Sequence, residues 1–179
     1  PVRGAEIIQG TPYNYETVAD AIEGCDAVVS TLNIFPATQG LFSRLEKPYD
    51  IMSVSVGNAI RLMKERGISR IVVMTSQGVG DSAGQIPLFF RILIRISNIR
   101  HAYKDHAAQE SLLEKSNLDW TVVRPVSLTD GTDNLSVINN LEGDRIIKSS
   151  ISRLAVACFI LDSIEKGLFI RQKPGISNN

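Results

Sequence analysis

The chain has 179 residues, the length of one domain, and its 19 basic and 19 acidic side chains cancel to a formal net charge of zero. This balance does not favour nucleic acid or a membrane as a partner. With 44% hydrophobic and 21% charged residues, the chain is too apolar to be disordered and large enough to fold without a structural metal or disulfide. We therefore expect one globular domain over residues 1–179.

The two cysteines, Cys25 and Cys158, have no second cysteine or histidine at metal-ligand spacing, so no metal is expected. Both are predicted to be small buried side chains of a protein in a reducing compartment. The longest apolar stretch, Ile86–Ile99, is interrupted by Arg91 and Arg95 and is shorter than the ~20 residues that span a bilayer. The expected location is cytoplasmic.

Short β-branched runs alternate with segments of helical periodicity. Strands are predicted at Ala5–Gln9, Asp26–Thr31, Arg70–Thr75 and Trp120–Pro125, with a weaker candidate at Ile146–Lys148. Helices are predicted from Asn14 to Gly24, from Asp50 to Gly67, from Ala102 to Lys115, and after a capping Ser152. The inward face of the last helix is predicted to hold Leu154, Cys158, Leu161 and Ile164. Apolar strands that alternate with helices indicate an α/β fold, a doubly wound parallel sheet covered on both faces.

Hydroxyl-bearing residues stand at or just after the end of each main predicted strand. They are Thr11, Ser30 to Asn33, Thr75 to Gln77, and Pro125 to Ser127. In doubly wound sheets, ligands bind outside the carboxyl ends of the strands. These groups suit an uncharged sugar or ring better than a metal. The alternative is that the hydroxyls only cap neighbouring backbone.

Three segments resemble a known family. They are Gly67–Ser76 (GISRIVVMTS), the stretch from Glu110 through Leu118–Pro125 (LDWTVVRP), and Ile151–Ala157 (ISRLAVA), which opens the last helix. They resemble the atypical short-chain dehydrogenases, the NmrA-like NAD(P)-binding proteins that include the biliverdin reductase B/flavin reductase group. The resemblance covers nearly the whole chain and implies a Rossmann-like domain.

The resemblance implies a dinucleotide, NADP or NAD with NADP slightly preferred, stretched across the strand ends. By position, Gly10 and Thr11 match the adenine-contacting turn, where the family usually carries an aspartate in place of Thr11. The backbone beside the ribose would be that of Ser30, Thr31, Leu32 and Asn33. The nicotinamide ribose and substrate would be approached by Thr75, Ser76 and Gln77, and the nicotinamide face by Pro125, Val126 and Ser127.

The beginning of the chain departs from the family pattern, which opens with a strand, a glycine-rich pyrophosphate loop, a helix and a second strand. Here residue 1 is a proline and no GxGxxG or GxxGxxG motif occurs. Ala5–Gln9 would match the third strand of the family. We therefore expect a fragment that lacks the first βαβ unit, a unit of roughly 30 or more residues, and whose sheet has an unpaired edge.

Conventional short-chain dehydrogenases use a tyrosine and a lysine spaced Y-x-x-x-K, and these positions fall on Ala102 and His106 here. The biliverdin reductase B group also lacks this pair and has a serine and a histidine, which Ser76 and His106 match. Ser76 is expected to bind the acceptor, His106 to relay a proton or shape the pocket, and Tyr103 to add a hydroxyl. The alternatives are a solvated helix-surface histidine and a tyrosine that packs against the next loop.

The segment Asp81–Ile99, which interleaves apolar residues with arginines, follows the Ser76 turn and could be a lid, an oligomer contact or a buried helix. The expected function is an NAD(P)H-dependent oxidoreductase that transfers hydride to a small planar acceptor such as a flavin, quinone or tetrapyrrole. The alternative is a non-catalytic NAD(P)-binding redox-sensing regulator or assembly factor. The expected partner is a small-molecule acceptor, and the expected state is a monomer or homodimer.

Overall fold

The structure, a computed structural model, describes residues 4–34, 42, 47–131, 135–141 and 148–179. Its helices are α1 (Tyr15–Ala21), α2 (Ile51–Arg66), the 3₁₀-helix η1 (Gly80–Gln85), α3 (Leu88–Ile96), α4 (Ile99–Glu114) and α5 (Arg153–Glu165). Its strands are β1 (Ala27–Ser30), β2 (Arg70–Met74), β3 (Asp119–Pro125), β4 (Ser127–Thr129), β5 (Val137–Asn139), β6 (Ser150–Ser152) and β7 (Gly175–Asn178).

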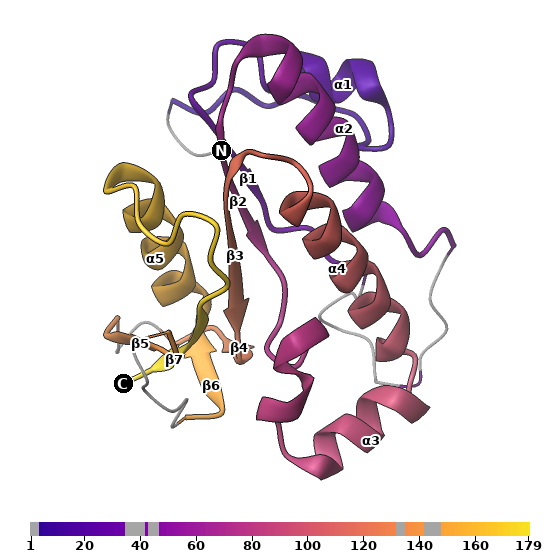
Figure 1. Cartoon of the computed structure of the whole chain (residues 1–179), viewed down its shortest axis with the longest axis vertical. Helices are drawn as coiled ribbons and strands as arrows, with labels where there is room; N and C mark the ends of the chain where they lie inside the picture. The colour runs from indigo at the N-terminus through magenta and orange to yellow at the C-terminus, as the bar shows by residue number, and fades with distance from the viewer. Residues whose placement is uncertain (1–3, 35–41, 43–46, 132–134, 142–147) are drawn as a thin grey trace.

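The main sheet has the strand order β1-β2-β3-β7-β5. The pairs β1–β2, β2–β3 and β3–β7 are parallel, and β5 pairs antiparallel with β7. The strands β4 and β6 form a separate parallel pair. In Figure 1, β2 and β3 run downwards, and η1 and α3 lie at the lower end of the molecule, where these strands finish. The predicted α/β parallel sheet is confirmed.

Helices cover both faces of the sheet. The helices α1, α2 and α4 lie on one side and α5 on the other (Figure 1). Both faces need this cover because successive buried side chains of β2 point into two different cores, one on each face of the sheet. Ile71 and Val73 belong to the core under α2 and α4, whereas Val72 belongs to the core under α5.

The helix boundaries follow the capping residues predicted from the sequence. The side chain of Asn14 accepts a hydrogen bond from the Thr17 amide, and that of Ser152 accepts one from the Ala155 amide. Gly67 ends α2 with a left-handed φ of 72°.

The start of α2 is capped by a side chain from α4, a helix that is distant in sequence. Asp50 makes no side-chain cap hydrogen bond there. The carboxylate of Asp105, on α4, instead accepts from the amides of Met52 at 2.9 Å and Ser53 at 3.2 Å.

The predicted strand at Ala5–Gln9 is wrong, because these residues have no regular secondary structure. Ile7 is 77% exposed and Ile8 40%. A β-branched run becomes a strand only when a neighbour pairs with it, and no described strand pairs with this one. Within the described residues, β1 pairs on one side only, and Val29 on it is 45% exposed. Of the weak candidate Ile146–Lys148, residues 146–147 lie outside the described residues, and Lys148 is in no strand.

The predicted inward face of α5 is wrong at Leu154 and Leu161, whereas Ile164 packs against the core as predicted. Leu154 and Leu161 are 44% and 56% exposed, and Cys158 and Ile164 are only partly buried. The buried positions are Ala155, Val156, Ile160 and Ser163. The helix is apolar around most of its circumference, so periodicity alone does not select the face that packs. Cys25, predicted to be buried, is exposed.

The segment after β2 forms η1 and α3, and no residue of α3 is buried. Leu88, Phe89 and Ile96 are 66%, 70% and 60% exposed, so the buried-helix interpretation of this segment is wrong. None of the helices in the described part of the chain has the length and apolar character needed to cross a membrane.

Candidate functional site

The predicted site residues of β2 and β3 lie at one edge of the sheet because the two strands end together. The Thr75 amide donates to the Val123 carbonyl at 2.8 Å, and the Gln77 amide donates to the Pro125 carbonyl at 2.9 Å. On the other side of β2, Ser30 ends β1 in register with Val73. The sets Ser30–Asn33, Thr75–Gln77 and Pro125–Ser127 therefore follow adjacent parallel strands at the same edge, as predicted.

Gly10 and Thr11 have a local structural role. Thr11 accepts a hydrogen bond from the Asn14 amide through its carbonyl, and a Cβ at Gly10 would lie only 2.3 Å from Thr17 Cγ2. Within the described residues, no hydrogen bond joins this turn to the strand ends. Its predicted contact with adenine stays a prediction.

Ser76 pairs with Tyr103 of α4. The two hydroxyl oxygens are 3.2 Å apart, and Tyr103 also donates to the Gln77 carbonyl at 3.1 Å. Burial raises the pKa of Tyr103 above its usual value of 10, although the hydrogen bond with Ser76 acts to lower it. Tyr103 is therefore a neutral phenol at physiological pH. The predicted second hydroxyl beside Ser76 is present, and Tyr103 also packs against the loop that carries Ser76.

His106 lies deeper than Tyr103 on the same helix, and the structure shows no hydrogen bond between His106 and Ser76. It is 4% exposed, and its Nδ1 is 3.1 Å from Gln109 Nε2, which also donates to the Met74 carbonyl. Nδ1 thus accepts, and Nε2 carries the proton of the neutral ring. Burial lowers the pKa of His106 to about 4, outweighing Asp105 and Glu110, which act to raise it. The alternative of a solvated surface histidine is wrong.

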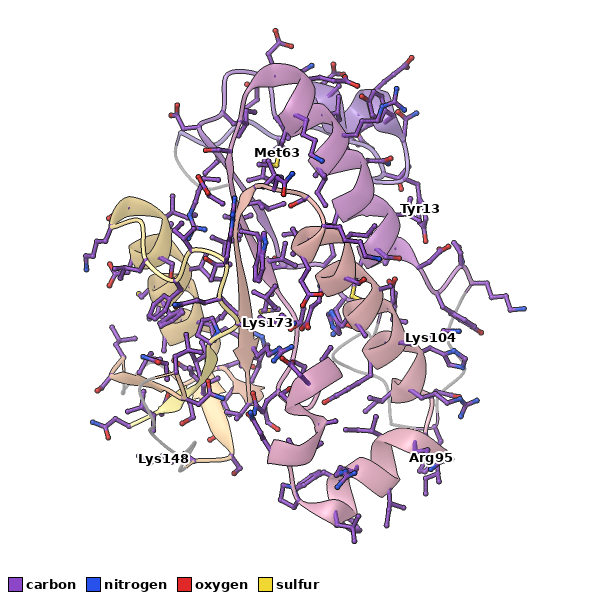
Figure 2. All side chains as sticks on the ribbon, viewed as in Figure 1. Tyr13, Met63, Arg95, Lys104, Lys148 and Lys173 are labelled. Atoms are coloured by element: carbon purple, nitrogen blue, oxygen red, sulfur yellow. The ribbon has the colours of Figure 1, made fainter. Side chains whose placement is uncertain are left out.

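A buried ion pair lies beneath the loop that carries Ser76. The Glu110 carboxylate accepts from Arg124 Nε at 3.0 Å and Nη2 at 2.5 Å, and both residues are about 96% buried. The same carboxylate accepts from Thr75 Oγ1 at 3.0 Å. Asp81 bonds Arg124 from the η1 side, and Lys173, labelled between β3 and α4 in Figure 2, lies 3.6 Å from Glu110.

Neither Glu110 nor Arg124 is predicted to be a site residue from the sequence. Arg124 itself could have indicated a buried ion pair, because a charged residue inside an otherwise apolar strand needs a buried partner.

Residues 2–167 match the model of a family described as NAD(P)H-binding. The chain belongs to this NAD(P)H-binding family. The predicted membership of the atypical short-chain dehydrogenase family is thereby confirmed. That the chain is most similar to the biliverdin reductase B group stays a prediction.

Individual relatives agree with this membership. The chain is 28% identical over 149 residues to the UPF0659 protein YMR090W of Saccharomyces cerevisiae, which covers 82% of this chain and 60% of that protein. The chain thus spans about 60% of the length of this curated relative.

Solved structures share the fold. ChuY, an anaerobilin reductase from Escherichia coli O157:H7, superposes with a TM-score of 0.75 at 20% identity, over 97% of this chain and 75% of that one. A short-chain dehydrogenase/reductase from Veillonella parvula in complex with NADP gives 0.73 at 16% identity, over 95% and 70%. The chain therefore has the NAD(P)-binding, Rossmann-like fold.

Two polar atoms at the strand ends fit a bound NAD(P). Ser30 Oγ and Gln77 Oε1 are buried and have no hydrogen-bond partner among the described residues. Buried polar atoms are normally paired, so a ligand that bonds them would satisfy both. A hydroxyl and an amide oxygen suit the ribose hydroxyls and carboxamide of such a ligand. The described residues contain no group of three or more side chains that could hold a metal ion.

Proposed function

We propose that this protein is an NAD(P)H-dependent oxidoreductase that transfers hydride to a small planar acceptor of the flavin, quinone or tetrapyrrole type. The observation that carries the proposal is the Ser76–Tyr103 hydroxyl pair, which lies at the end of β2 beside Thr75 and Pro125. The name of ChuY, an anaerobilin reductase, supports a tetrapyrrole among the candidate acceptors. The NADP complex of the Veillonella neighbour supports NADP ahead of NAD.

Reduced nicotinamide, when bound, supplies the hydride. The protein then has to orient the acceptor and manage one proton. Ser76, only partly buried, can donate its hydroxyl proton to a carbonyl oxygen or ring nitrogen of the acceptor. Tyr103 positions Ser76 and holds a second proton on its phenol, because burial raises the pKa of that phenol.

A second candidate is a non-catalytic NAD(P)-binding regulator. The observation that favours it is His106, which occupies the lysine position of the Y-x-x-x-K pattern. Its Nδ1 is occupied by Gln109, and with a pKa of about 4 it carries no positive charge at neutral pH. It therefore cannot take the part of a lysine that lowers the pKa of a neighbouring tyrosine.

The test is to mix the purified protein with NADPH or NADH and a panel of FMN, menadione and biliverdin. Absorbance reports oxidation of the nicotinamide, and fluorescence reports coenzyme binding. Oxidation that requires the protein and declines in Ser76→Ala supports the enzyme. Coenzyme binding without oxidation across the panel supports the regulator instead.

A further inference from the structure

A cavity of about 300 Å³ opens between the loop after β2 and α3. Its wall combines apolar side chains with two guanidinium groups. The residues that line it include Gly78, Ile86, Leu88, Arg91, Ile92 and Arg95. In Figure 2, Arg95 lies on α3 at the end of the molecule opposite Met63 on α2, the end at which β2 and β3 finish.

The two arginines carry charge that no ion pair with a described residue neutralises. Arg91 and Arg95 are four residues apart on one helix, so their side chains start from the same face. Both are exposed, α3 contains no acidic residue, and neither arginine has an ion pair with any described residue. This contrasts with Arg124, whose charge is paired twice. A guanidinium beside apolar walls is suited to a carboxylate or phosphate carried by a hydrophobic molecule.

The cavity is attached to the Ser76 loop. Gly78, two residues after Ser76, forms part of its wall with a φ of +94°, and a Cβ there would lie 2.7 Å from Ile86 Cδ1. Gln77 Nε2 also donates to Gln85 Oε1 at 2.7 Å, which fastens the end of η1 to the same loop. The cavity wall and the Ser76 hydroxyl are therefore held on one short, tightly packed segment.

We propose that this cavity holds the anionic substituents of the acceptor, so that the preferred acceptor is a flat apolar molecule carrying carboxylate or phosphate groups. Arg91 and Arg95 pair with those groups, while Ile86, Leu88 and Ile92 contact the apolar body. This inference rests on the proposed function, because it assigns the cavity to the substrate of that site.

A second copy of the chain is a poorer occupant of this face. A symmetric contact through α3 would bring the arginines of one copy toward those of the other, with no acidic residue on the helix to separate them. A small anionic molecule fills the cavity without that repulsion.

The test compares, without coenzyme, ligand pairs in which one member carries an anionic group that the other lacks or has esterified. FMN against riboflavin tests phosphate, and biliverdin against its dimethyl ester tests carboxylate. Flavin fluorescence and bilin absorbance give the two dissociation constants of each pair. We expect the charged member to bind at least about tenfold more tightly in one pair, and that pair identifies the anion. In Arg91→Gln/Arg95→Gln the preference should fall to within about twofold. Arg61→Gln, on α2 and paired with Glu65, is the matched control and should keep the preference.

Equal affinities within both pairs, or a preference that survives in the double variant, would overturn the inference. A third outcome would also overturn it: the protein shows no preference for the charged ligand in either pair, but it sediments with anionic vesicles and this sedimentation requires Arg91 and Arg95. The outcomes separate this inference from the proposed function, since binding is measured without turnover. A charge preference without NADPH oxidation supports the cavity and contradicts the reductase. Oxidation of NADPH by the neutral acceptors, without any preference for the charged ligands, supports the reductase and contradicts the assignment of the cavity.

Discussion

The Glu110 carboxylate accepts two hydrogen bonds from Arg124, at 3.0 and 2.5 Å, and a third from the Thr75 hydroxyl. The pair joins α4 to β3 and holds the residue immediately before Ser76. A buried ion pair of this kind contributes less to net stability than to the choice of one arrangement. Its consequence here is that the ends of β2 and β3 and the C-terminal half of α4 are held together at the candidate site.

Replacing Glu110 by Gln should destabilise the protein by about 3 kcal/mol, because the buried Arg124 loses its buried counter-charge and one of two acceptor oxygens, and its remaining ion pair is with the mostly exposed Asp81. Urea unfolding measures this change. Glu65→Gln is the matched control, since it weakens an exposed pair with Arg61 and should cost less than about 1 kcal/mol. Equal losses in the two variants would show that Glu110 and Arg124 do not act as a buried pair.

Ser76→Ala should lower kcat at least about tenfold while changing coenzyme affinity little, because the hydroxyl is expected to contact the acceptor. Tyr103→Phe, which keeps the ring, should have a smaller effect of the same kind. Because the two oxygens lie 3.2 Å apart, the double variant should lose less than the sum of the two single losses. Steady-state kinetics of the four proteins form the cycle, and strict additivity would contradict a functional pair.

His106 should make the folded state sensitive to acid. Its pKa is about 4 when folded, below the usual 6.5, so the unfolded chain binds more protons between these values. The contribution of neutral His106 to the free energy of unfolding is therefore fully present above about pH 6.5 and is lost as the pH falls toward 4. At pH 4.5 the loss is about 2 kcal/mol. Unfolding free energies of the wild type and His106→Gln at pH 7 and 4.5 measure the difference. A variant with the same pH dependence as the wild type would exclude His106 as its source.

Asp105→Ala should destabilise the protein by about 2 kcal/mol, because two amides at the start of α2 lose their common acceptor in a buried position. Asp105→Asn keeps one acceptor oxygen and should recover part of the loss. Asp50→Ala, which removes an exposed bond to Tyr13 and no cap, should cost less. Thermal melting of the three variants ranks them, and Asp50→Ala as the most damaging would contradict the cap from α4.

The parts of the fold that could be predicted depend on interactions between near neighbours in the chain. Asn14 and Ser152 cap their helices through amides three residues later, and Gly67 ends α2 because it accepts a positive φ. The long apolar strands β2 and β3 were predicted for the same reason. The strand β6, with three residues, exists because β4 lies beside it, and so short a run carries no readable period.

The sequence by itself determined the α/β class, the family, and the alignment of hydroxyl-bearing residues at the strand ends, because periodicity, caps and motifs act over a few residues. Only the tertiary structure decided that Ser76 meets Tyr103 rather than His106, that Asp105 caps α2, and that α3 stays exposed with its arginines in no ion pair with a described residue. Each of these depends on which side chains, tens of residues apart, are brought together by packing. Their burial then selects the partners and shifts the pKa values, and no local pattern records that outcome.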